Sequence, residues 1–462
     1  MSSQSAHSTH PRLFLDPHHP IRSLSTAFWI WKALLIGIVV YCPGPGYDTS
    51  TGLLPYQLPG APISSPQSDS HTSCSVFLKF VRWDAIYFVH TAEHGYVFEQ
   101  EWAFGYGYSR ILSLLYSVLH QFNGLSGVTG IAIVAVALSH VAHFLSVLAL
   151  YRLSANIFGQ KTTAQRLICF LSAALHIICP AGAFLSAPYG EALFSFLNIT
   201  GFYVYSSSLL DDSAGRKVTS AAKLLITSVL FSTATTIRSN GILSGFVFAC
   251  DAVSLFQKIL LQGPSKDTCL RFSVTVIGGC VVALGMIIPQ AVAYADFCLD
   301  LPTPRPWCGN LIPSIYGWVQ SHYWNVGFLR YWTASNLPLF LLAIPMLLTL
   351  CRSSIWALKE AWLHSSQADQ PASSALSASL LTRLAVPQGL LAVLAFTSYH
   401  VQIINRICSG YPLWYWYLAS QLVGYRREPR GENKSYRGLA IQVMVAYALF
   451  QAILFGSFLP PA

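Results

Sequence analysis

Apolar segments of membrane-spanning length recur along most of this 462-residue chain. A transmembrane helix needs roughly 20 mainly apolar residues to cross the hydrocarbon core of a bilayer. Eight runs approach or exceed that length, at about 26–42, 127–151, 167–186, 189–210, 241–260, 272–295, 384–404 and 438–458. Three shorter or interrupted runs, near 223–236, 336–351 and 411–424, bring the expected number of spans to roughly eleven. The pattern predicts an all-α polytopic membrane protein.

Composition and charge fit this class and indicate an orientation. The chain is 53% hydrophobic and only 10% charged, which excludes an ordinary soluble domain. Most of its 27 Lys and Arg residues fall in a few loops or in the N-terminal part, which includes Arg12, Arg22 and Lys32. The basic loops are 152–166, 211–223, 258–271, 352–383 and 426–437. Because positive residues stay on the cytoplasmic side, these loops and an N-terminal tail, residues 1–25, are predicted to be cytosolic. The net charge of +9 therefore requires no nucleic-acid partner.

Two long loops, 43–108 and 296–335, then fall on the luminal side, and function is expected there. The first begins as a linker rich in Pro, Gly and Ser, and residues 76–93 then fit an amphipathic helix. Its apolar stripe would contain Phe77, Phe80, Val81, Asp84 and Phe88. A carboxylate on such a face should be partly desolvated and therefore a good proton acceptor. The alternative is that Asp84 pairs with a neighbouring Arg at the membrane surface.

Glu99, Glu101 and Trp102 follow in the same loop. Carboxylates beside aromatic rings can bind sugar hydroxyls while the rings stack on a pyranose face, although a solvated turn has the same composition. The chain has no Asp-x-Asp pair, no phosphate-binding Gly-rich loop with Lys and no His-Glu-x-x-His sequence. These sequence features therefore predict no metal site.

Ionisable residues near the luminal ends of predicted spans are costly and therefore informative. Glu191 and Arg238 lie at two luminal turns, and Arg330 and Arg406 fall on the same side. The forked Arg side chain suits phosphate oxygens, so these residues could form a cationic phosphate site. The alternative is that each is an interfacial residue that snorkels or pairs with Glu191.

The second luminal loop contains the most distinctive string of the chain, residues 322–333. Aromatic belts at membrane interfaces explain its Tyr and Trp residues, but not the polar residues His322, Asn325 and Arg330. Cys298 and Cys308 lie close together in the same loop, where an oxidising lumen would permit a disulfide.

Several of these strings together resemble the GPI mannosyltransferase 2 family. They are Arg82-Trp83-Asp84-Ala85, residues 93–105, residues 186–194, Arg238-Ser239-Asn240-Gly241 and residues 322–333. The resemblance implies a GT-C fold over residues 26–462 in the endoplasmic reticulum membrane, with the active site facing the lumen. It further implies transfer of the second mannose, in α1,6 linkage, from dolichyl phosphate mannose to a glycosylphosphatidylinositol (GPI) precursor. Trp83 and Asp84 match the family's first-loop motif, whereas Gly105-Tyr106-Gly107 departs from its usual Phe-Pro-Gly-like sequence.

The chemistry implied by the resemblance assigns roles to these residues. A β-linked donor and an α-linked product require inversion, for which Asp84 is the candidate base. Both substrates are lipid-linked, no cofactor is obligatory, and a small membrane subunit could be a partner. The predicted substrate-binding residues are Arg82, Trp83, Glu99, Glu101, Trp102, Glu191, Arg238, Asn240, His322, Trp324, Asn325, Arg330 and Arg406. The alternatives are another dolichyl-phosphate-sugar transferase of the same fold, or a transporter or scramblase with Glu191, Asp251 and Arg238 along its path.

Overall fold

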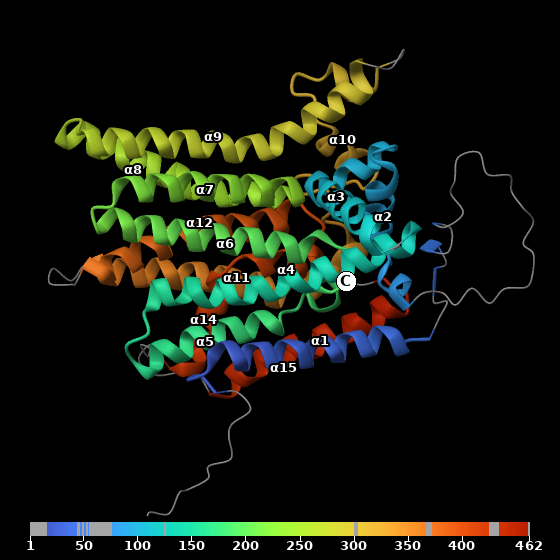
Figure 1. The fold of residues 1–462 in the computed structure, drawn as a ribbon, viewed down its shortest axis with the longest axis horizontal. Helices are drawn as coiled ribbons and strands as arrows, with labels where there is room; N and C mark the ends of the chain where they lie inside the picture. The colour runs from blue at the N-terminus through green and yellow to red at the C-terminus, as the bar shows by residue number, and fades with distance from the viewer. Residues whose placement is uncertain are drawn as a thin grey trace, which may run out of the picture.

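The protein is described here from a computed structural model, in which the chain forms a bundle of helices lying side by side (Figure 1). The structure describes residues 16–43, 47–48, 50–51, 54, 76–123, 126–299, 304–365, 372–424 and 434–460. Within these ranges every regular element is a helix. The predicted all-α fold is therefore confirmed for the described part of the chain.

Nine helices in these ranges are long and apolar enough to cross a membrane. Their main parts are α1 (Pro20–Tyr41), α4 (Gly127–Phe158), α6 (Gly190–Ser213), α7 (Lys217–Ile237), α8 (Phe246–Gln262), α9 (Lys266–Tyr294), α11 (Leu337–Ser365), α12 (Ala372–Thr397) and α15 (Lys434–Gly456). The spans that contain α8, α9 and α11 also include an adjoining short helical turn. Two further predicted spans correspond to shorter helices, α5 (Thr163–Ile177) and α14 (Leu413–Val423). Each of the roughly eleven predicted spans thus has a helical counterpart.

The two ends of the bundle differ in character (Figure 1). The turns that join α4 to α5, α6 to α7 and α8 to α9 lie at one end, and they belong to the basic loops predicted to be cytosolic. The other end, here called the loop end, carries α2 (Ala85–His94), α3 (Tyr106–Asn123) and α10 (Ile315–His322). The basic loops and the predicted luminal loops are therefore separated, as the proposed orientation requires.

Lys32 is an exception to the charge analysis, which assigned it to the cytosolic side. It lies inside α1, and its side chain is fully buried. Its amine donates hydrogen bonds to the backbone oxygen of Leu185 and to Ser186 Oγ, each at 2.8 Å. Lys32 is therefore a buried donor rather than a cytosolic charge.

The first luminal loop departs from the predicted single helix. Residues Val76–Phe80 form a short 3-10 turn, the chain then breaks, and α2 begins only at Ala85. The break follows from Trp83, whose φ of 54° lies in the left-handed region and cannot continue a right-handed helix. The helical prediction was wrong across this break, and Asp84 lies at the start of α2 rather than on an apolar stripe. Most of the Pro-rich linker lies outside the described residues.

Close backbone approach explains the departure at Gly105 and Gly107. A Cβ on Gly105 would lie 1.6 Å from the backbone oxygen of Ile237, at the end of α7, and one on Gly107 would lie 2.1 Å from Thr236 Oγ1. Only glycine fits this contact. The turn leads into α3. The structure shows a separate helix at the loop end (Figure 1).

The second luminal loop packs against the first. Cys298 and Cys308 form a disulfide, and the indole of Trp307 is buried beside it. Trp307 Nε1 donates to Glu99 Oε1 and Tyr323 OH donates to Glu99 Oε2, both at 3.1 Å. A carboxylate of the first loop thus holds two parts of the second.

The chain contains two glycosylation sequons, at Asn198 and Asn433, and we expect neither to carry a glycan. Asn198 is buried in α6, where its amide donates to the Gly410 oxygen at 3.0 Å and its oxygen accepts from Ser244 at 2.7 Å. Asn433 lies outside the described residues, in a loop predicted to be cytosolic. Treatment with endoglycosidase should therefore leave the gel mobility of the protein unchanged.

A positive control for this test is Ser70→Asn, which completes an Asn-His-Thr sequon in the first luminal loop. We expect this variant to gain a glycan that the enzyme removes. A glycan on Asn433, or none on the Ser70→Asn variant, would contradict the proposed orientation.

Candidate functional site

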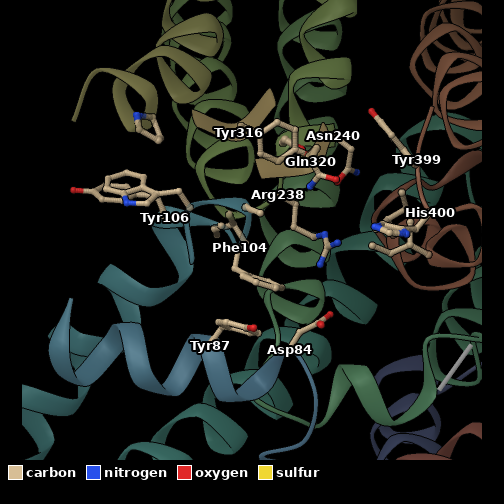
Figure 2. A pocket seen from close by; sticks show the side chains of 18 of the residues that line it. Asp84, Tyr87, Phe104, Tyr106, Arg238, Asn240, Tyr316, Gln320, Tyr399 and His400 are labelled. Carbon is tan, nitrogen blue, oxygen red and sulfur yellow. The ribbon is translucent and has the colours of Figure 1, made fainter. Parts of the chain in front are cut away.

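A cavity of about 460 Å³ opens at the loop end of the bundle (Figure 2). Its walls come from the start of α2, the turn before α3, the loop-end parts of α7 and α9, helix α10, and residues 399–407. Figure 2 shows Asp84 and Tyr87 on one side, Tyr316, Gln320 and Asn240 on the opposite side, and Arg238 between them. Segments more than 300 residues apart in the chain therefore share one cavity.

Asp84 occupies this cavity as half of an ion pair. Its Oδ2 accepts from Nη1 and Nη2 of Arg406, at 3.3 Å each, and its side chain is 35% exposed. The carboxylate does not cap α2, although the residue stands at the N-terminus of that helix. The left-handed Trp83 just before it carries strain of about 1–3 kcal/mol, which is typical of functional sites. Asp84 thus pairs with an Arg, as the alternative predicted, but with one 322 positions away in the chain rather than with a neighbour.

The pair continues into a buried cluster of alternating charges. Glu191, fully buried in the first turn of α6, accepts from Arg238 Nη1 at 2.8 Å, and its Oε1 lies 3.5 Å from Arg406 Nε. Two carboxylates and two guanidinium groups therefore lie together, and both Arg residues line the cavity. The predicted pairing of an Arg with Glu191 is present.

Arg406 is held as a cation by its surroundings. Its guanidinium lies over the rings of Phe184 and Tyr189, at 4.5 and 5.5 Å from their centroids. Burial alone would lower its pKa, but the Glu191 and Asp84 carboxylates more than offset this effect, so the pKa of Arg406 is raised above its usual value. The cavity thus contains a permanent positive charge.

Three predicted aromatic residues, Trp83, Trp102 and Trp324, also line the cavity. Trp102 is stacked against Tyr106, and Trp324 meets Phe104 edge-on, each pair with a centroid separation of 5.6 Å. Within the described residues, the buried indole N–H groups of Trp83 and Trp102 have no hydrogen-bond partner. They are available to donate to a ligand.

Other predicted site residues are placed elsewhere. Glu99 ties the two luminal loops together, and Glu101 closes its own turn by accepting from the backbone N–H groups of Val97 and Phe98, at 2.7 and 2.8 Å. Glu101 also contacts His90 Nδ1 at 2.6 Å. Neither carboxylate lines the cavity, and both are engaged in hydrogen bonds that hold the loops. Their sugar-binding role stays a prediction.

Arg82, His322, Asn325 and Arg330 also lie outside the cavity lining. Arg82 is buried with its guanidinium over the ring of Phe458, whereas the other three residues are exposed. His322 stacks on Trp318, at a centroid separation of 4.4 Å. The predicted role of these residues in substrate binding stays a prediction, and in this structure none of them lines the cavity.

The string at residues 322–333 has a different role in this structure. Its backbone turns at Asn325 and Leu329, both with positive φ, and Leu329 N–H donates to the Thr397 oxygen at 2.7 Å. Trp332 Nε1 donates to the Phe396 oxygen at 2.8 Å. The string is thereby fastened to the end of α12, while Trp324 remains part of the cavity wall.

Sequence analysis missed several polar residues of the cavity. They are Tyr87, Gln290, Tyr316, Gln320, Tyr399, His400 and Gln402. Burial, with the nearby Arg406 charge, lowers the pKa of His400 despite the opposing effect of Asp84, so its imidazole is neutral near pH 7. His400 lies near the luminal end of a predicted span. The cost of placing an ionisable residue there, which selected Arg406, could have selected His400 too.

The described residues contain no group of three or more His, Cys, Asp or Glu able to hold a metal ion. Asp251, which the transporter alternative placed along a path with Glu191 and Arg238, does not line the cavity. It accepts from Arg383 Nε at 2.5 Å and from Tyr205 OH at 2.8 Å, as part of a separate buried pair. The structure therefore does not join these three residues in one path.

Fold and site together define an integral membrane protein with a charged, aromatic-walled cavity at one end of a helical bundle. Residues 34–462 match the family described as Mannosyltransferase (PIG-V). The chain is 61% identical to GPI mannosyltransferase 2 of Aspergillus oryzae, over 97% of each chain. It is 53% identical to GPI mannosyltransferase 2 of Aspergillus fumigatus, over 97% of this chain and 95% of the relative. The chain belongs to the PIG-V mannosyltransferase family, and it is therefore a GPI mannosyltransferase.

Solved structures offer a more distant comparison. The oligosaccharyltransferase of Archaeoglobus fulgidus, tethered with an acceptor peptide, aligns with a TM-score of 0.42 and 11% identity. The alignment covers 94% of this chain and 55% of that one, so this chain spans about half the length of the oligosaccharyltransferase. The GT-C fold class therefore follows from the family rather than from this likeness.

Proposed function

We propose that the protein transfers the second mannose, in α1,6 linkage, from dolichyl phosphate mannose to a GPI precursor in the endoplasmic reticulum membrane. The reaction takes place in the cavity at the loop end, which faces the lumen. The observation that carries the proposal is the Asp84 carboxylate, placed in that cavity beside the guanidinium of Arg406. The same cavity thus holds a candidate base and a candidate phosphate-binding cation, the two kinds of group that an inverting transfer from a sugar phosphate uses.

Asp84 is the proposed general base. The acceptor hydroxyl oxygen attacks the anomeric carbon of the β-linked donor, and its proton passes to the Asp84 carboxylate. The bond between the anomeric carbon and the phosphate oxygen breaks on the opposite face, which inverts the configuration. Dolichyl phosphate leaves with the bonding electron pair. The ion pair with Arg406 holds the Asp84 carboxylate in the cavity of the resting site.

Arg406 and Arg238 are the proposed phosphate ligands. Negative charge develops on the phosphate as the bond breaks, and prearranged cations stabilise it without reorganisation. Both guanidinium groups line the cavity and are oriented by Glu191, which leaves other N–H groups of each fork for phosphate oxygens. We expect transfer to proceed without an added cofactor.

The opposite wall suits the sugars of the acceptor. It is polar but uncharged, and it is formed by Asn240, Tyr316 and Gln320 (Figure 2). Amide and hydroxyl groups exchange hydrogen bonds with sugar hydroxyls, and the free indole N–H groups of Trp83 and Trp102 add donors. The donor phosphate would thus bind beside Arg406, with the acceptor glycan across the cavity. That a small membrane subunit is a partner of the protein remains a prediction.

Transfer by the purified protein tests this proposal. Dolichyl phosphate mannose with a labelled sugar is offered with two anchor intermediates, one carrying a single mannose and one carrying none. We expect labelling only of the first, with the label released by an α1,6-specific mannosidase. Labelling of the unmannosylated intermediate, or release by an enzyme of another linkage specificity, would contradict the proposed step.

A further inference from the structure

Lys32 is a buried titratable side chain for which the proposed reaction has no role. It lies within the span of α1, where its relative exposure is 0%. A basic group inside a membrane span is costly and is retained where it serves a purpose. Both of its hydrogen bonds are accepted by one short segment of the chain, which indicates that Lys32 holds that segment in place.

That segment consists of residues 182–189 and is here called the cradle segment. It begins with the 3-10 turn Gly182–Leu185 and ends just before the start of α6. Lys32 Nζ donates to the Leu185 oxygen and to Ser186 Oγ, and Ser139 Oγ donates to the Ala187 oxygen at 2.7 Å. Side chains of α1 and α4 therefore hold three consecutive residues, the last residue of the 3-10 turn and the two that follow it.

The cradle segment contacts Arg406 and the backbone that leads to Asp84. Its residues Phe184 and Tyr189 lie against the Arg406 guanidinium. The hydroxyl of Tyr189 donates to the Arg82 oxygen at 3.0 Å, one peptide before the strained Trp83 that leads to Asp84. A shift of this segment would move the cation and the base relative to each other.

We propose that Lys32 is a positioning residue for mannose transfer: it fixes the cradle segment, and the segment sets the geometry of Arg406 against Asp84. The inference rests on the proposed function, because it assumes that this ion pair acts in the reaction. It assigns to α1 a part in catalysis although α1 contributes no residue to the cavity lining.

The test is a double-mutant cycle with Lys32→Met and Arg406→Lys. Met has a similar length and no donor, so Lys32→Met frees the Leu185 oxygen without leaving a charge in the bundle. We expect the purified variant to lose about 10- to 100-fold in kcat, because a small misplacement of catalytic groups costs this much. Since Lys32 acts through Arg406, the double variant should be no more than about threefold slower than Arg406→Lys alone, as expected for coupled sites.

A matched control separates positioning from general stability. Gln388 is also fully buried, and its amide donates to Ser353 Oγ and the Leu350 oxygen, at 2.7 and 3.2 Å. Any loss of kcat caused by Gln388→Met should multiply with the loss caused by Arg406→Lys when the two substitutions are combined in one variant. If Lys32→Met multiplies in the same way, Lys32 is a structural residue and the inference is wrong.

Two further results keep the test decisive. If Lys32→Met does not accumulate, the same cycle is run with Ser186→Ala, which removes one acceptor of the lysine and should show the same non-multiplicative pattern. If Arg406→Lys transfers mannose as fast as the parent, the proposed function stands but Arg406 has no role in it, and the inference that Lys32 acts through Arg406 is wrong. If Arg406→Lys is impaired and its loss multiplies with that of Lys32→Met, the role of Arg406 stands and only the positioning role of Lys32 is wrong.

Discussion

Asp84→Asn is expected to abolish measurable mannose transfer while leaving the amount of folded protein close to that of the parent. The amide keeps the shape of the side chain but cannot accept the proton of the acceptor hydroxyl. General bases contribute about 10²- to 10⁴-fold, so a loss of roughly 10³-fold, or about 4 kcal/mol of transition-state stabilisation, is expected. Labelled transfer by the purified variant, at saturating concentrations of both substrates, measures this loss.

Asp212→Asn is a matched control for this variant. Asp212 is also a partly exposed carboxylate, paired with Lys217 at 2.9 Å and with Arg271 at 3.2 Å. It belongs to the last turn of α6, which joins α7 at the end of the bundle opposite the loop end. We expect its kcat to stay within about twofold of the parent, because surface ion pairs contribute little. Equal activity of Asp84→Asn and the parent would remove Asp84 from the role of base, and another acceptor of the proton would have to be found.

Arg406→Lys should produce the second-largest loss, about 10²-fold or more in kcat, as removal of one preorganised donor to a developing anion usually does. Lysine keeps the charge but has no fork, so it cannot contact Asp84 and Glu191 while still donating to a phosphate oxygen. Glu191 would keep Arg238 as a partner, which should preserve the fold. The kcat and the apparent KM for the lipid-linked donor are both measured.

Arg330→Lys makes the same change at an exposed residue outside the cavity, and it should leave both constants within about twofold of the parent. The opposite pattern, with Arg330→Lys impaired and Arg406→Lys active, would restore the original assignment of the phosphate contact to Arg330. It would also require the second luminal loop to move into the cavity when the donor binds.

The spans could be predicted from the sequence because a bilayer imposes a length and a composition on every helix that crosses it. Asp84, Glu191, Arg238 and Arg406 could be selected for a similar reason, since charges are costly near a membrane. The choice between Arg330 and Arg406 could not be made. Both fall on the luminal side, and only long-range packing decides which one reaches the cavity.

Local periodicity failed at the start of α2 for a related reason. The spacing of Phe80, Asp84 and Phe88 fits a continuous helix, and nothing in the sequence marks Trp83 as left-handed. That conformation persists because tertiary contacts hold the turn, among them the edge-on packing of Trp83 on Phe458, near the other end of the chain. Likewise, the hydrogen bonds that occupy Glu99 come from residues more than 200 positions away.

The ion pair in the cavity joins residues 322 positions apart, which constrains how the protein is made. At a synthesis rate of about 5–20 residues per second, Asp84 leaves the ribosome roughly 16–65 s before Arg406. Glu191 acquires Arg238 as its partner after only 47 residues, so this buried carboxylate is neutralised early. Asp84 has no such interim partner in the cavity. A nascent chain stalled before residue 406 would therefore present an incomplete charge cluster at the loop end.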